Sequence, residues 1–232
     1  RRHRVVVALL GLRAVSLGVV RAVLEFRTSW DSSSPVHVHV AEQPAEVEAC
    51  LAAHGRRPIE LLLESVDVDA AWCLVHATHA TPHEIRGLAA RGAVTGLCPT
   101  TEANLGDGLF DLPALLAEAG CFGIGTDSHV SVCPFEELRW LEYGQRLRTG
   151  RRLIVDGPTP HVGANLWSRA AAGGARALGL PVGRIEPGAP ADWLVFERPE
   201  DPDVTREELL DVAVFARPPR RRATWIAGCP PE

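Results

Sequence analysis

Two histidines and a carboxylate stand close together in one short stretch of this sequence. Residues 36–43 read V-H-V-H-V-A-E-Q, so His37 and His39 flank one valine and Glu42 follows shortly after. Because side chains alternate between the two faces of a β-strand, both imidazoles are expected on one face and the valines on the other. A buried imidazole needs a partner for each ring nitrogen. The stretch alone allows two interpretations: a functional site, or one hydrogen-bonded core histidine beside a solvent-facing one.

Further residues of metal-ligand type follow later apolar runs. His76 ends the run W-C-L-V-H, and Asp127 follows G-I-G-T. The carboxyl ends of the strands form the active-site face of a parallel barrel, so His39, His76 and Asp127 are expected to converge. Imidazole and carboxylate bind catalytic zinc, which lowers the pKa of a bound water to about 7 to 9. Glu42 is placed to move protons there. Singly, His76 as a core histidine and Asp127 as a turn cap are simpler explanations; together, the residues favour a metal site.

The elements that must position these residues alternate along the chain. Apolar runs of strand length are expected to form strands at residues 5–10, 36–40, 72–75, 93–98 and 121–125. Helical spacing predicts helices at residues 14–26, 46–54, 57–65, 112–119, 134–148 and 163–178. Thr81 is expected to cap a further helix, with Pro82 in its first position and Glu84 completing a capping box. The polar, glycine-rich residues 99–108 are expected to form a loop, either over a site or merely at the surface. This alternation predicts parallel β/α units.

Beyond residue 180 the pattern changes. Residues 183–196 predict a tight turn and a strand, and residues 212–216 and 224–227 predict two more strands. A charged helix is expected near residues 205–210. We therefore expect two units, with residues 1–180 belonging to an α/β barrel and residues 181–232 forming part of a small β-rich side domain.

Composition excludes several classes of function. The net charge of the 232 residues is −5, and the longest basic run is residues 220–222, which argues against nucleic acid or an anionic membrane as the main partner. Six scattered cysteines without a C-x-x-C pair indicate reduced thiols in a cytoplasmic protein. No apolar run is long enough to span a bilayer, and the apolar run near the start stops too early for a signal peptide. The sequence contains no methionine, so we expect that it does not begin where its protein begins.

Five longer motifs give the sequence a resemblance to a known family. They are H-V-H-V-A-E-Q at 37–43, W-C-L-V-H-A-T-H at 72–79, T-E-A-N-L-G-D-G at 101–108, G-I-G-T-D-S-H at 123–129 and E-E-L-R-W-L-E-Y-G-Q-R-L-R at 136–148. Together they resemble the N-formimino-L-glutamate deiminases of the amidohydrolase superfamily. The histidine and aspartate pattern would indicate the superfamily alone. The third and fifth motifs favour these deiminases over the guanine, cytosine and adenosylhomocysteine deaminases.

The resemblance implies a fold and a set of roles. The fold would be the (β/α)8 TIM-type barrel of the metal-dependent hydrolases. His39 and Asp127 would ligate Zn2+, although another divalent transition metal is an alternative. Glu42 would pass a proton to the imino nitrogen of the substrate, His76 would orient or polarise the hydroxide, and Asp127 would also accept the proton of the attacking water. The reaction would convert N-formimino-L-glutamate to N-formyl-L-glutamate and ammonia, a step of histidine degradation.

The roles expected of Arg13 and of three further histidines are less specific. Arg13, in L-R-A-V, would bind a carboxylate of this small-molecule substrate, and an ordinary surface arginine is the alternative. His37 would pack deeper in the barrel and would not be a ligand. His79 and His129 are expected to be loop residues.

The sequence departs from the family in two places. The family carries a His-x-His pair on its first barrel strand, whereas the spacing from His39 to His76 and Asp127 places the pair seen here on the fifth strand. The chain would then hold strands 4 to 8 of an incomplete barrel and lack the first-strand pair. The family also has P-H where this sequence has Leu9 and Leu10, just before Arg13.

These departures leave alternatives open. Exposed sheet edges would favour pairing with another chain, for example as a homodimer, and the chain alone is expected to have little activity. Within the enzymes, the alternative is another amidohydrolase deaminase. The alternative of a different class is a non-catalytic remnant or scaffold.

Overall fold

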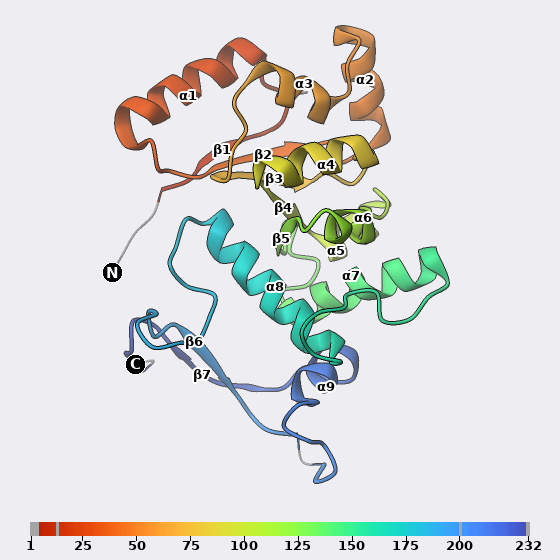
Figure 1. Ribbon diagram of the computed structural model, residues 1–232, viewed down its shortest axis with the longest axis vertical. Coiled ribbons are helices and arrows are strands. Elements are labelled where there is room, and N and C mark those ends of the chain that lie inside the picture. Colours follow the sequence, from red (N-terminus) through yellow and green to blue (C-terminus); the bar gives the residue numbers. More distant parts are fainter. Residues whose placement is uncertain (1–4, 13, 200, 231–232) are drawn as a thin grey trace.

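Five short parallel strands form the sheet that carries the predicted site (Figure 1). The computed structural model describes residues 5–12, 14–199 and 201–230. The strands pair in chain order and are β1 (Val7–Leu9), β2 (Val36–Val40), β3 (Trp72–His76), β4 (Val94–Leu97) and β5 (Cys121–Ile124). Each strand pairs in parallel with the next, and His39 lies opposite Val75. The predicted alternation of strands and helices in parallel β/α units is therefore confirmed.

The helices surround this sheet, with α1 to α4 on one side of it and α8 running beside β5 in Figure 1. Their bounds are α1 (Leu17–Asp31), α2 (Pro44–His54), α3 (Pro58–Ser65), α4 (Pro82–Arg91), α5 (Pro99–Leu105), α6 (Leu112–Ala117), α7 (Pro134–Thr149), α8 (Val162–Ala177) and α9 (Leu209–Phe215).

Local signals set many of the helix ends. Prolines occupy the first turns of α2 to α7, where the missing N–H would have no partner within the helix. Thr81 and Glu84 form the predicted capping box, and left-handed Gly92 ends α4. Helix α2 begins at Pro44, two residues before the predicted start at residue 46.

The valines and histidines of β2 lie on opposite faces of the strand, as the alternation in the sequence predicts. Val36, Val38 and Val40 are fully buried in the main hydrophobic core, while His37 and His39 are half-buried on the opposite face. Burying three valines in this way contributes about 1.5 to 3 kcal/mol each, so a register slip of one residue would be costly. The hydrophobic face therefore determines which way His39 points.

Three predicted elements are wrong. Residues 99–108 are not a loop throughout, because Pro99 begins helix α5 and left-handed Gly106 ends it. The predicted strand at 212–216 and helix at 205–210 are replaced by α9, which starts only at Leu209. A short apolar run cannot by itself distinguish a strand from a buried helix turn, and here Ala213 and Val214 are buried in a helix that packs on α7 and α8.

The C-terminal part contains a second, smaller sheet. Strands β6 (Trp193–Phe196) and β7 (Arg221–Trp225) pair in antiparallel fashion. The ring of Phe196 contacts Phe135 and Trp167, which connects this sheet to α7 and α8. The division at residue 180 stays a prediction. In the described part of the chain, no helix is both long and apolar enough to cross a membrane.

Helix α8 approaches β5 closely because the contact is made by glycine. A Cβ on Gly173 would overlap the backbone of Phe122, and one on Gly123 would lie 3.1 Å from the nitrogen of Gly174. By contrast, a Cβ on Gly174 itself would meet nothing within 4 Å.

This difference gives a matched pair of substitutions. We expect Gly173→Ala to lower the free energy of unfolding by about 3 kcal/mol or more, because rigid backbone must move to admit the methyl group. Gly174→Ala should leave it unchanged or raise it by up to about 1 kcal/mol, since alanine is the better helix former. Urea denaturation of both variants measures this, and equal losses would contradict the close contact of α8 with β5.

Candidate active site

His39 lies at the carboxyl end of β2, whereas His37 lies deeper in the sheet and contacts the backbone of α8. The Nε2 atom of His37 is 2.8 Å from the carbonyl oxygen of Ala177, at the end of α8. The Nδ1 atom of His39 is 3.4 Å from the carbonyl oxygen of Leu9 on β1. If His39 donates through Nδ1, its Nε2 lone pair is free to bind a ligand. This arrangement agrees with the prediction that His37 packs inside the barrel and is not a metal ligand.

The backbone is strained where these strands end. His76 and Ala77 at the end of β3 have φ of +65° and +51°, Ala41 after β2 has +50°, and Asp127 after β5 has +38°. The left-handed region costs a residue with a Cβ roughly 1 to 2 kcal/mol. Such strain is typical of sites where side chains must be aimed against the local preference of the backbone.

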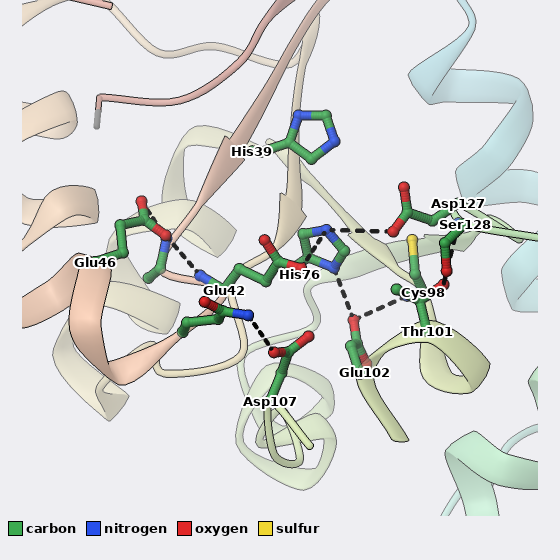
Figure 2. A network of polar contacts seen from close by, with 12 residues as sticks. His39, Glu42, Glu46, His76, Cys98, Thr101, Glu102, Asp107, Asp127 and Ser128 are labelled. Carbon is green, nitrogen blue, oxygen red and sulfur yellow. Dashed lines mark hydrogen bonds and ion pairs between the residues drawn. The ribbon is translucent and has the colours of Figure 1, made fainter. Parts of the chain in front are cut away.

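Four predicted residues converge at this edge of the sheet (Figure 2). Ligand atoms of His39, His76 and Asp127 all lie within 4.8 Å of one another. The Nε2 atom of His76 is 3.6 Å from Oε1 of Glu42 and 3.9 Å from Oδ2 of Asp127. The imidazole of His76 is buried, with 1% of its side chain exposed, while Asp127 is open to solvent.

The three ligand atoms suit a divalent transition metal. Zinc bonds of about 2.0 to 2.2 Å allow ligand atoms to stand up to about 4.4 Å apart. The observed spread exceeds this by a few tenths of an ångström, which small side-chain rotations can close. Two imidazoles and a carboxylate are a common catalytic zinc set, and Asp127 leaves an open side toward solvent. His76 thus joins His39 and Asp127 as a candidate ligand, as its residue type allowed, although the resemblance implied only that it orients or polarises the hydroxide.

Glu42 is held so that its carboxyl faces His76. Its backbone N–H donates to Glu46 Oε2 at 2.9 Å, and the N–H of Ala41 donates to Glu46 Oε1 at 3.0 Å. Burial raises the pKa of Glu42, the His76 imidazole acts against this, and both the charge of Asp107 and a hydrogen bond to it raise the pKa further. A raised pKa keeps a carboxyl protonated to higher pH, which suits a proton donor.

His76 is surrounded by carboxylates. Burial by itself lowers the pKa of His76, but its hydrogen bond to Glu102 and the charges of Glu42, Glu102 and Asp127 outweigh burial, so the pKa is raised. A positive charge is therefore favoured at this position, whether it comes from a protonated imidazole or from a metal ion.

The loop after β5 is anchored to α5. The hydroxyl of Thr101 accepts the backbone N–H of Ser128 at 3.2 Å and lies 2.9 Å from the hydroxyl of Ser128. Because Ser128 is the neighbour of Asp127, these bonds fix the turn that presents the Asp127 carboxylate (Figure 2).

The remaining predicted residues are less well placed. Arg13 lies outside the described residues, so its predicted role is not tested. A groove of about 350 Å³ opens beside His39 and Glu42. That groove is lined by Leu10, Ala14, His39, Glu42, Gln43 and Glu46. His79 and His129 lie in turns, as predicted for loop residues, and His129 is exposed.

Sequence reasoning missed two acids of the site. Glu102 is 4% exposed and bonds His76, and Asp107 is also 4% exposed and accepts from Gln43 Nε2 at 3.0 Å. Both belong to the motif T-E-A-N-L-G-D-G, which served only as a mark of resemblance. The segment was expected to be a loop, either over a site or at the surface. Nothing in that expectation indicated that these two acids are buried, because helix α5, which contains Glu102, was not predicted.

Comparisons with known proteins give consistent matches. Residues 15–229 match the amidohydrolase family. The chain is 48% identical over 222 residues to a formimidoylglutamate deiminase from Pseudomonas aeruginosa, covering 94% of this chain and 48% of that protein. It is 34% identical over 170 residues to a 5-methylthioadenosine/S-adenosylhomocysteine deaminase from Halobacterium salinarum, covering 72% of this chain and 38% of that protein. The chain thus spans about half the length, or less, of the curated relatives it matches.

Solved structures match over nearly the whole chain. An amidohydrolase from Brucella melitensis aligns with a TM-score of 0.90 at 40% identity, covering 97% of this chain and 49% of that one. An adenosine deaminase from Xanthomonas campestris with bound zinc aligns with a TM-score of 0.85 at 26% identity, covering 97% of this chain and 51% of that one. These matches confirm the predicted fold class, an α/β barrel of the metal-dependent hydrolase type.

The geometry predicts how zinc binding depends on each histidine of β2. We expect His39→Ala to weaken zinc binding by more than about tenfold, because even the outer partners of metal ligands contribute about 10- to 100-fold. His37→Ala should leave the affinity unchanged, since its Nε2 faces Ala177. Competition with a chromophoric chelator measures both affinities, after circular dichroism has shown that each variant is folded. Equal loss in the two variants would exclude His39 as a specific ligand.

Proposed function

Since this chain belongs to the amidohydrolase family, we propose that it carries part of the active site of a zinc-dependent deiminase. Its substrate would be N-formimino-L-glutamate, which is hydrolysed to N-formyl-L-glutamate and ammonia in histidine degradation. The observation that carries the proposal is the 48% identity to a formimidoylglutamate deiminase over 94% of the chain. The convergence of His39, Glu42, His76 and Asp127 supports it.

Each residue takes a defined part in the reaction. His39 and Asp127, with His76 beside them, would hold the zinc ion. When bound, zinc would lower the pKa of a water molecule and so supply hydroxide at neutral pH. Asp127 accepts a proton from the attacking water, and His76 orients the oxygen that adds to the formimino carbon. The new C–O bond forms as the carbon–nitrogen double bond opens to a single bond and the nitrogen takes a first proton. The carbon–nitrogen bond then breaks as Asp127 returns its proton to that nitrogen, while the hydroxyl proton passes to Glu42 and the carbonyl forms.

Glu42 supplies the proton that the leaving nitrogen needs. Burial raises the pKa of its carboxyl, and the charge of Asp107 and a hydrogen bond to Asp107 raise it further. Glu42 therefore keeps its proton to higher pH than an exposed carboxyl does. Glu42 can pass that proton to the imino nitrogen, which then departs as ammonia.

A second candidate function has its own support. The match to a methylthioadenosine and adenosylhomocysteine deaminase at 34% identity favours another amidohydrolase deaminase as the alternative within the enzymes. A non-catalytic chain is the alternative outside them, and it rests on the absence of a second His-x-His pair from the sequence.

An activity assay tests the proposal. We expect the 232-residue chain alone to release little ammonia from N-formimino-L-glutamate. Fusion to the portion of the Pseudomonas aeruginosa deiminase that the match leaves uncovered should restore turnover. Glu42→Gln in the fusion should lower kcat by about 100- to 10,000-fold, the usual contribution of a positioned acid or base. A fusion that folds, binds zinc and deaminates S-adenosylhomocysteine instead would favour the alternative deaminase.

Arg13 provides a test of substrate class. In the active fusion, Arg13→Ala should lower kcat/KM for N-formimino-L-glutamate by about 10- to 100-fold, because a hydrogen bond to a charged group is worth about 1.5 to 3 kcal/mol. Arg21→Ala is the matched control, since Arg21 lies on α1 and bonds the carbonyl oxygen of Ser65 at 3.5 Å. No loss with Arg13→Ala would remove the proposed carboxylate contact.

A further inference from the structure

We propose that Glu102 is a positioning residue that fixes the tautomer of His76. By accepting a hydrogen bond from Nδ1, it would keep the Nε2 lone pair directed at the centre of the site. This inference rests on the proposed function for its purpose, but its geometry stands on the described residues alone. It assigns a role to a buried acid that the reaction as proposed above does not use.

Glu102 is itself held rigidly. Its backbone N–H donates to the carbonyl oxygen of Cys98 at 2.9 Å, and its Oε1 atom accepts the N–H of Cys98 at 2.9 Å. This reciprocal pair closes the first turn of α5 and leaves the carboxylate little freedom to rotate (Figure 2). Its 4% exposure excludes most water from competing for the same oxygen.

The same oxygen, Oε1, lies 3.3 Å from Nδ1 of His76. A carboxylate can only accept a hydrogen bond, so Nδ1 must carry the proton of this pair. In the neutral imidazole the lone pair is then on Nε2, the atom that faces Glu42 and Asp127. Glu102 thereby selects which nitrogen of His76 can bind a metal or orient an oxygen.

The backbone of His76 makes such support necessary. With φ of +65°, His76 sits in a backbone conformation that a residue with a Cβ disfavours. Glu102 reaches it from α5, 26 residues further along the chain. The simpler explanation is that Glu102 only caps the helix through Cys98, and the two roles differ in what happens to the His76 ring.

Nitrogen NMR of the whole chain, without metal, separates the two roles. The protein is labelled with 15N-histidine and held at a pH above the raised pKa of His76, so that the imidazole is neutral. With His76→Gln used for assignment, we expect His76 to show a protonated Nδ1 and an unprotonated Nε2. Glu102→Ala should make the two nitrogens exchange these shifts or average them. Glu102→Gln, whose amide oxygen can still accept from Nδ1, should keep the wild-type pattern. Unchanged His76 shifts in a folded Glu102→Ala protein would overturn the proposal.

Glu137→Gln is the matched control. This buried acid holds the same helix by accepting the N–H of Thr100 at 2.9 Å, and no contact joins it to His76 in the described structure. If it disturbs the His76 tautomer as much as Glu102→Ala does, the effect is a general loosening of α5 and the proposal fails.

Zinc titration of the same variants connects the inference to the proposed function. Glu102→Ala should weaken zinc binding by about 10- to 100-fold, and Glu102→Gln should recover most of that loss. A changed tautomer with unchanged zinc affinity would support Glu102 as the positioning residue while showing that His76 is not a ligand. The two proposals can therefore fail separately.

Discussion

The arrangement of charge around His76 is the constraint on which the rest of the site depends. One imidazole that is almost completely buried lies within 4 Å of three carboxylates, those of Glu42, Glu102 and Asp127. Like charges brought together out of water repel strongly, so this group is stable only if it retains protons or holds a cation. The raised pKa of His76 and the fit to a divalent metal both follow from this excess of negative charge, whereas the pKa of Glu42 is raised first by burial and then by its acidic neighbours.

The scaffold must hold that cluster together against the preferences of the backbone. Left-handed residues occur after β2, at the end of β3 and after β5, where the chain leaves the sheet. Hydrogen bonds from neighbouring elements stabilise these turns: Glu46 of α2 accepts the N–H groups of Ala41 and Glu42, and Thr101 of α5 holds Ser128. The helices therefore act on the site directly and do more than cover the core.

The five-stranded sheet has two open edges. Strands β1 and β5 are the edges of the described sheet, and β1 is only three residues long. An unpaired edge strand can form hydrogen bonds with a strand of another chain. Short edge strands and helices that cover the edge limit such pairing. Helix α8 approaches β5 through glycine contacts. The matches with relatives cover about half of each relative.

The sequence by itself determined which segments form the strands of the main sheet, most helix ends and the face on which His39 stands, because these depend on side-chain alternation and on caps within a few residues. It also singled out His39, Glu42, His76 and Asp127. Only the tertiary structure decided that residues 99–105 form a helix, and that Glu102 and Asp107 are buried beside His76 and Gln43. Those contacts join positions 26 and 64 residues apart, and no local pattern of residues specifies a distance in space between them.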